Sequence, residues 1–175
     1  MKFTTKDMVK ASIFLALGLL IPYVFHLTGL PGPIFLPMHI PVLLCGFLMG
    51  PQYGLMIGFI TPLLNAFLTG MPPLYPVGIS MAFELATYGF TAGWLYKNRR
   101  MNVFVSLIAA MLLGRVIAGT ANYIILGFAG KKYVFQVFLM SAFVKAIWGI
   151  IIQLALIPVT VKAIEKWEGK VNLNG

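Results

Sequence analysis

The sequence predicts an all-α integral membrane protein, a six-transmembrane-helix bundle with both termini cytoplasmic. This prediction rests on the composition, the spacing of the apolar stretches and the distribution of the cations. Of the 175 residues, 60% are hydrophobic and 10% are charged, whereas an ordinary soluble domain is about a quarter charged. A soluble chain of this length cannot bury so much apolar surface, so the excess must face lipid. The composition therefore excludes a soluble enzyme, a disordered region and a nucleic-acid-binding domain.

Six apolar stretches of helical length follow one another along the chain. A helix needs about 20 mainly apolar residues to cross the hydrocarbon core of a bilayer. We expect spans at residues 7–27, 37–50, 52–69, 77–96, 102–127 and 136–162. No soluble segment and no clear internal repeat separates them, so we expect one membrane domain over residues 1–175.

Glycine and proline mark the ends of the first three spans. The first span stops at the Gly- and Pro-rich segment 29–33. The second is short and begins at Pro37, so we expect it to be tilted or partly re-entrant. Gly50-Pro51 forms the turn into the third span, which ends at the proline-rich segment 70–76.

The connections between the last three spans are basic or glycine-rich. The run 97–100 separates the fourth span from the fifth, and the segment 127–132 separates the fifth from the sixth. With six spans, only Lys131 and Lys132 fall in loops on one side. The cations on the other side are Lys2, Lys6, Lys10, Lys97, Arg99, Arg100, Lys162, Lys166 and Lys170. The positive-inside rule makes that side cytoplasmic, so the net charge of +9 reflects membrane topology rather than a nucleic-acid partner.

Motifs for energy coupling and catalysis are missing from the sequence. The glycine-lysine cluster at 127–132 lacks the spacing of a phosphate-binding loop. There is no metal-binding His/Glu helix motif and no Ser-His-Asp set, and the single Cys45 permits no intrachain disulfide. We therefore expect no enzyme activity, no catalytic residue, no metal and no cofactor. Six spans without a repeat resemble half of a transporter, so we expect an oligomer or the binding module of a larger complex.

Three charged residues fall well within the expected spans, away from their ends: Glu84 in the fourth, Arg115 in the fifth and Lys145 in the sixth. Each costs roughly 2.5 to 3.5 kcal/mol on insertion scales, so such residues usually face a partner or a cavity. Asn122 lies two helical turns after Arg115, on the same face. We expect a ligand pocket in the outer half of the bundle. The alternative is a structural ion pair of Glu84 with Lys145 or Arg115.

Polar side chains at helical spacing add one stripe on the fourth span and one on the sixth. They are Ser80, Glu84, Thr87 and Tyr88 on the fourth, and Ser141, Lys145 and Trp148 on the sixth. Trp148 is a candidate for stacking on a flat ligand ring, with plain packing as the alternative. His39 is a candidate ligand contact, or else a residue that caps the second helix or lies at the interface.

The charges of these candidates indicate a ligand class. Two cations against one anion leave a local charge of +1, which suits a monoanionic ligand such as a carboxylate. An arginine fork binds a carboxylate through paired hydrogen bonds. The candidate ligand-binding residues are Glu84, Tyr88, Arg115, Asn122, Lys145, Trp148 and His39.

Small residues four apart permit helices to approach closely. Such pairs are Ser12 and Ala16 in the first span, Gly46 and Gly50 in the second, and Gly54 and Gly58 in the third. They serve either internal packing, which the sequence favours, or contact with the helices of a partner.

Several segments together resemble a known family. Residues 35–54 read FLPMHIPVLLCGFLMGPQYG, and the resemblance continues through TPLLN at 61–65, GMPPLYP at 70–76, FELATYG at 83–89 and LGR at 113–115. These segments are similar to the S components of energy-coupling factor (ECF) transporters, which are small six-helix membrane proteins that bind vitamins. The resemblance spans nearly the whole chain. Niacin-type members are the most similar, and pantothenate-type members are a close second.

The resemblance implies a bacterial plasma-membrane protein that binds its vitamin at the outer face. It implies association with a membrane coupling protein and two cytoplasmic ATPase subunits, whose ATP hydrolysis drives uptake. A small-residue motif on the first helix of S components contacts the coupling protein, and here Ser12 and Ala16 occupy that position instead of two alanines. The competing hypothesis is a stand-alone oligomeric carrier or channel, which needs a continuous polar path. The polar residues here gather towards the outside instead.

Overall fold

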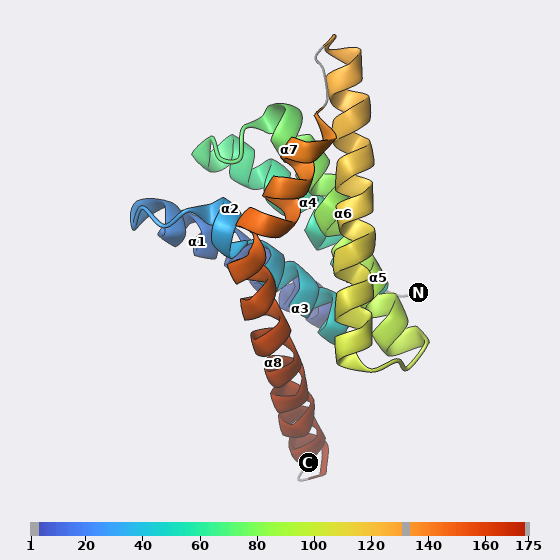
Figure 1. Ribbon diagram of the computed structural model, residues 1–175. Coiled ribbons are helices and arrows are strands. Elements are labelled where there is room, and N and C mark those ends of the chain that lie inside the picture. The colour runs from blue at the N-terminus through green and yellow to red at the C-terminus, as the bar shows by residue number, and fades with distance from the viewer. Residues whose placement is uncertain (1–3, 131–133, 174–175) are drawn as a thin grey trace.

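The computed structural model describes residues 4–130 and 134–173, and these residues contain helices and loops but no strand (Figure 1). Thr4 caps the first helix, with its side chain accepting a hydrogen bond from the Asp7 amide, and Asn102 caps α6 in the same way at the Phe104 amide. In chain order the elements are α1 (Thr5–Leu27), α2 (Gly32–Phe35), α3 (His39–Met49), α4 (Pro51–Thr69), η1 (Leu74–Gly78), α5 (Ile79–Gly93), η2 (Trp94–Asn98), α6 (Val103–Phe128), α7 (Phe135–Leu139), η3 (Met140–Lys145) and α8 (Ile147–Leu173).

Helix α5 lies at the centre of the bundle, in contact with α3, α4 and α6. Glycines allow this close packing. A Cβ atom at Gly46 or Gly54 would overlap the backbone of Gly89, and one at Gly58 would overlap the backbone of Leu85. The glycines of α3 and α4 therefore serve internal packing, as the sequence favours. Gly50 instead takes a φ of 101° in the turn between these helices, a conformation that favours glycine.

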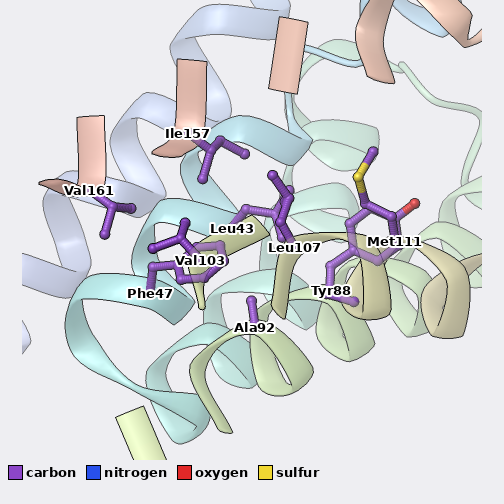
Figure 2. Close-up of a cluster of buried hydrophobic side chains, with 10 residues drawn as sticks. Leu43, Phe47, Tyr88, Ala92, Val103, Leu107, Met111, Ile157 and Val161 are labelled. Atoms are coloured by element: carbon purple, nitrogen blue, oxygen red, sulfur yellow. The ribbon is translucent and has the colours of Figure 1, made fainter. Parts of the chain in front are cut away.

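Two clusters of buried side chains form the core. Figure 2 shows the larger one, in which α3, α5, α6 and α8 meet around Leu43, Phe47, Tyr88 and Leu107. A second cluster lies between α1, α3, α4 and α5 and includes Cys45, which is fully buried. The basic segment that follows α5 contacts the end of α3, where Lys97 donates a hydrogen bond to the carbonyl of Leu48.

Four helical stretches among the described residues are long and apolar enough to cross a membrane: Thr5–Leu27, Gly32–Met49, Val103–Phe128 and Ile147–Trp167. Helices α4 and α5, which fall in the third and fourth expected spans, are not among them. Helix α5 by itself has 15 residues, fewer than the about 20 that a crossing of the hydrocarbon core needs. Polar side chains such as Thr61, Asn65 and Glu84 lie buried on them.

Two of the expected spans have different ends or shapes in the structure. The short second span is lengthened by α2, and the chain bends between α2 and α3 at Leu36, which has a φ of 51°. The expected continuous span 136–162 is broken. The chain forms α7 and the π-helical η3, turns at Ala146, where ψ is 4°, and continues as α8 to Leu173 (Figure 1).

Candidate functional site

A cavity of about 770 Å³ opens at the end of the bundle where α1, α4 and α6 finish and α5 begins. This is the end opposite the basic segment 97–100, because α5 runs from the cavity to that segment. Prolines, methionines and aromatic side chains make up most of the wall. Polar residues in the wall include His39, Asn65, Ser80, Glu84, Arg115 and Asn122. An apolar cavity with a few convergent polar groups is the usual form of a small-molecule site.

An ion pair lies in the wall of this cavity. Nη1 of Arg115 is 2.9 Å from Oε1 of Glu84, and both side chains are nine-tenths or more buried. Helix α5 points Glu84 towards α6 because Ser80, Glu84 and Tyr88 follow one another at one-turn spacing and share a buried face. The other terminal nitrogen of Arg115, Nη2, is buried and has no hydrogen-bond partner among the described residues. The guanidinium of Arg115 therefore has one terminal nitrogen unpaired within the described part of the protein.

His39 and Tyr88 lie next to the ion pair. Nε2 of His39 lies 3.7 Å from Oε1 of Glu84, and the His39 ring meets the Tyr88 ring edge-on with centroids 5.3 Å apart. His39 lines the cavity, whereas Tyr88 is fully buried and packs against Gly114 of α6. Both ring nitrogens of His39 and the Tyr88 hydroxyl are buried without a hydrogen-bond partner among the described residues. The structure thus brings Glu84, Arg115, His39 and Tyr88 together.

Asn122 lies further out on α6 and also lines the cavity. Its Nδ2 donates to the carbonyl of Ala118 at 2.9 Å, within its own helix. Arg115 and Asn122 are two helical turns apart, and both line the same cavity, as residues on one face of a helix should.

The structure does not bring Lys145 and Trp148 to the cavity. Both side chains are exposed, Trp148 by 60%, and neither lines the wall, although Ser141 does. The stripe on the sixth span assumed regular α-helical spacing from 141 to 148. The chain turns at Ala146, where ψ is 4°, so regular α-helical spacing does not continue from Ser141 to Trp148.

The charge balance of the site changes as a consequence. The surplus of +1 required Lys145 beside Arg115 and Glu84. Among the described residues of the wall, the charges of Arg115 and Glu84 cancel, so a positive surplus no longer supports the choice of an anionic ligand.

Sequence reasoning did not select Asn65 of α4, which is 1% exposed and lines the cavity. Its Nδ2 donates to the carbonyl of Gly18 in α1 at 3.0 Å. The sequence feature that could have identified Asn65 is a carboxamide side chain within an apolar span. The partner on α1 lies 47 residues away in sequence, and no local pattern predicts that contact.

Ser12 and Ala16 lie on an exposed face of α1. The Ser12 hydroxyl donates to the carbonyl of Met8 in its own helix, at 2.9 Å. Apolar neighbours such as Ile13 and Leu20 are exposed as well. Among the described residues, this face is available to lipid or to a partner helix.

Comparison with known families decides the identity of the fold and its general role. A family model described as "ECF transporter, substrate-specific component" matches residues 6–161. The chain belongs to this family. No curated protein matches it. As an ECF substrate-specific component, it is a multi-pass membrane protein, a transport subunit rather than an enzyme. Family membership implies a small-molecule substrate and an ECF module as its partner.

Proposed function

We propose that this ECF substrate-specific component captures a small water-soluble vitamin in the cavity formed by the ends of α1, α4, α5 and α6. The observation that carries the proposal is the buried Glu84–Arg115 pair in the cavity wall. Ionisable residues in membrane segments are costly and usually mark a substrate site or pathway. The proposed contacts are Glu84, Arg115, His39 and Asn122, and the Tyr88 ring packs edge-on against His39. Lys145 and Trp148 are left out because they are exposed away from the wall.

We propose that the vitamin carries a carboxylate, which the free Nη2 of Arg115 binds. Niacin is the candidate favoured by sequence resemblance, and pantothenate is next. The Glu84–Arg115 pair adds a second requirement for the ligand. Glu84 accepts hydrogen bonds and repels a second anion, so the ligand should carry hydrogen-bond donors besides one carboxylate. Pantothenate carries hydroxyl and amide donors besides its carboxylate, whereas nicotinate has no donor. The wall therefore suits pantothenate at least as well as nicotinate, and titration with both acids distinguishes them.

We further propose that the bundle crosses a bacterial plasma membrane six times, with both termini cytoplasmic. In this topology α4 and α5 are the third and fourth spans, and the cavity opens at the outer face. The cations at 97–100 then lie in the cytoplasm, as the positive-inside rule requires.

The proposed partners are a membrane coupling protein and two cytoplasmic ATPase subunits, which drive release and uptake of the bound vitamin. The exposed Ser12–Ala16 face of α1 is the proposed contact with the coupling protein. Its small side chains allow another helix to approach closely.

The topology has a direct test by cysteine labelling in intact cells. With a membrane-impermeant reagent, Ala129→Cys should be modified from outside, whereas Asn98→Cys should react only after the membrane is opened. Both positions are exposed at helix ends. The native Cys45 is fully buried and should give a low background. The opposite labelling pattern would refute the proposed orientation.

The division of labour between the subunits gives a second prediction. The purified chain should bind vitamin without ATP, so mass spectrometry should find one co-purifying in the folded protein. In liposomes the same chain should accumulate none, because the described segments contain no phosphate-binding loop. Accumulation by the chain alone would identify it as a stand-alone carrier and contradict the proposal.

A further inference from the structure

Helix α1 contains a proline beside the cavity. Pro22 lies within the helix, which continues to Leu27. Proline has no amide hydrogen, so the carbonyl of Gly18, four residues earlier, loses its partner within the helix. In a membrane such a carbonyl must be satisfied by a neighbouring group.

Asn65 supplies the missing donor from another helix. Its Nδ2 lies 3.0 Å from the Gly18 oxygen and 3.3 Å from the carbonyl oxygen of Thr61 in its own helix. The site is tightly packed, because a Cβ atom at Gly18 would lie 2.8 Å from Cγ2 of Thr61. Asn65 and Pro22 both line the cavity, so the hydrogen bond joins α4 to α1 at the cavity wall.

The part of α1 beyond Pro22 has no fully buried residue, although the Phe25 ring contacts the Phe35 ring of α2. The buried residues of α1, Ala11 and Gly18, both precede Pro22. Beyond it, Tyr23, Phe25 and His26 line the cavity, while Val24 and Leu27 are more than half exposed. A helix loses one intrahelical hydrogen bond at a proline and bends there more easily.

We propose that residues 22–27 of α1 form a hinged wall of the cavity and that Asn65 is the positioning residue that holds this wall closed. The hydrogen bond from Asn65 to the Gly18 carbonyl replaces the one that Pro22 removes. When this bond is present, the outer segment of α1 has one position against α4. When it is absent, the segment pivots about Pro22. This inference concerns the chain alone and does not depend on which vitamin binds.

Distances between spin labels in nanodiscs, measured without ligand, test the hinge. One label pair, at Val24 of α1 and Phe67 of α4, reports the outer segment, and both native side chains are exposed. A second pair, at Ile13 and Phe67, reports the part of α1 before Pro22. Asn65→Ala should broaden and shift the Val24–Phe67 distances and leave the Ile13–Phe67 distances unchanged.

A double mutant identifies the acceptor. Pro22→Ala restores an amide donor to the Gly18 carbonyl within α1, so Pro22→Ala/Asn65→Ala should recover the narrow Val24–Phe67 distribution. Asn122→Ala is the matched control, because its Nδ2 donates within its own helix and its loss should move neither pair. If Asn65→Ala alone does not fold, the double mutant should fold, because Pro22→Ala again supplies a donor to the Gly18 carbonyl. An unchanged distribution in folded Asn65→Ala, or a double mutant that is not rescued, would overturn the proposal.

Discussion

Arg115→Ala should destabilise the folded protein by about 3 to 5 kcal/mol, because it leaves the carboxylate of Glu84 buried without its cation. The two groups are 2.9 Å apart, and both are nearly fully buried. Glu84→Ala should cause a loss of similar size by leaving the guanidinium unpaired. Unfolding by denaturant in mixed micelles, monitored by circular dichroism, measures both losses.

A neutral pair provides the matched control for this prediction. Replacing both members of a buried ion pair by uncharged side chains of similar volume is often close to neutral. Glu84→Gln/Arg115→Met should therefore recover most of the stability that either alanine variant loses. If Arg115→Ala is as stable as the wild type, the ion pair does not exist in the folded protein.

Gly89→Val should prevent normal folding, with a loss of at least about 3 kcal/mol, at the upper end of what overpacking costs. A Cβ atom at Gly89 would overlap the backbone of Gly54 in α4, and a backbone cannot move aside as a side chain can. The same change at Gly127 of α6 is the control, because a Cβ atom there meets nothing within 4 Å. The yield of monodisperse protein and its unfolding free energy measure the difference. Equal losses in the two variants would show that α4 and α5 do not cross at Gly89.

Much of the fold and part of the site follow from local sequence patterns. Glycine and proline mark most helix ends, and charges within apolar spans single out Glu84 and Arg115, which the structure pairs. The site residues on α5 and α6 were predictable because these helices keep regular α-helical spacing across Ser80–Tyr88 and Arg115–Asn122.

The rest depends on features that local patterns do not contain. Lys145 and Trp148 do not line the cavity with Ser141, and neither glycine nor proline marks the turn at Ala146 in the sequence. The role of Asn65 depends on which helix lies beside α4. Pro22 indicates that the Gly18 carbonyl has no partner within α1. Which side chain of a neighbouring helix donates to it cannot be predicted from the local sequence.

The central claim is that Arg115 holds the acidic group of a vitamin in the cavity. Its most direct test is calorimetric titration of the wild type and of the folded Glu84→Gln/Arg115→Met variant with nicotinate and with pantothenate. We predict that the wild type binds at least one of the two acids. The variant should bind that acid roughly 10- to 150-fold more weakly, because it lacks a charge-assisted contact worth about 1.5 to 3 kcal/mol. A wild type that binds neither acid, or a variant that binds as tightly as the wild type, would contradict the claim.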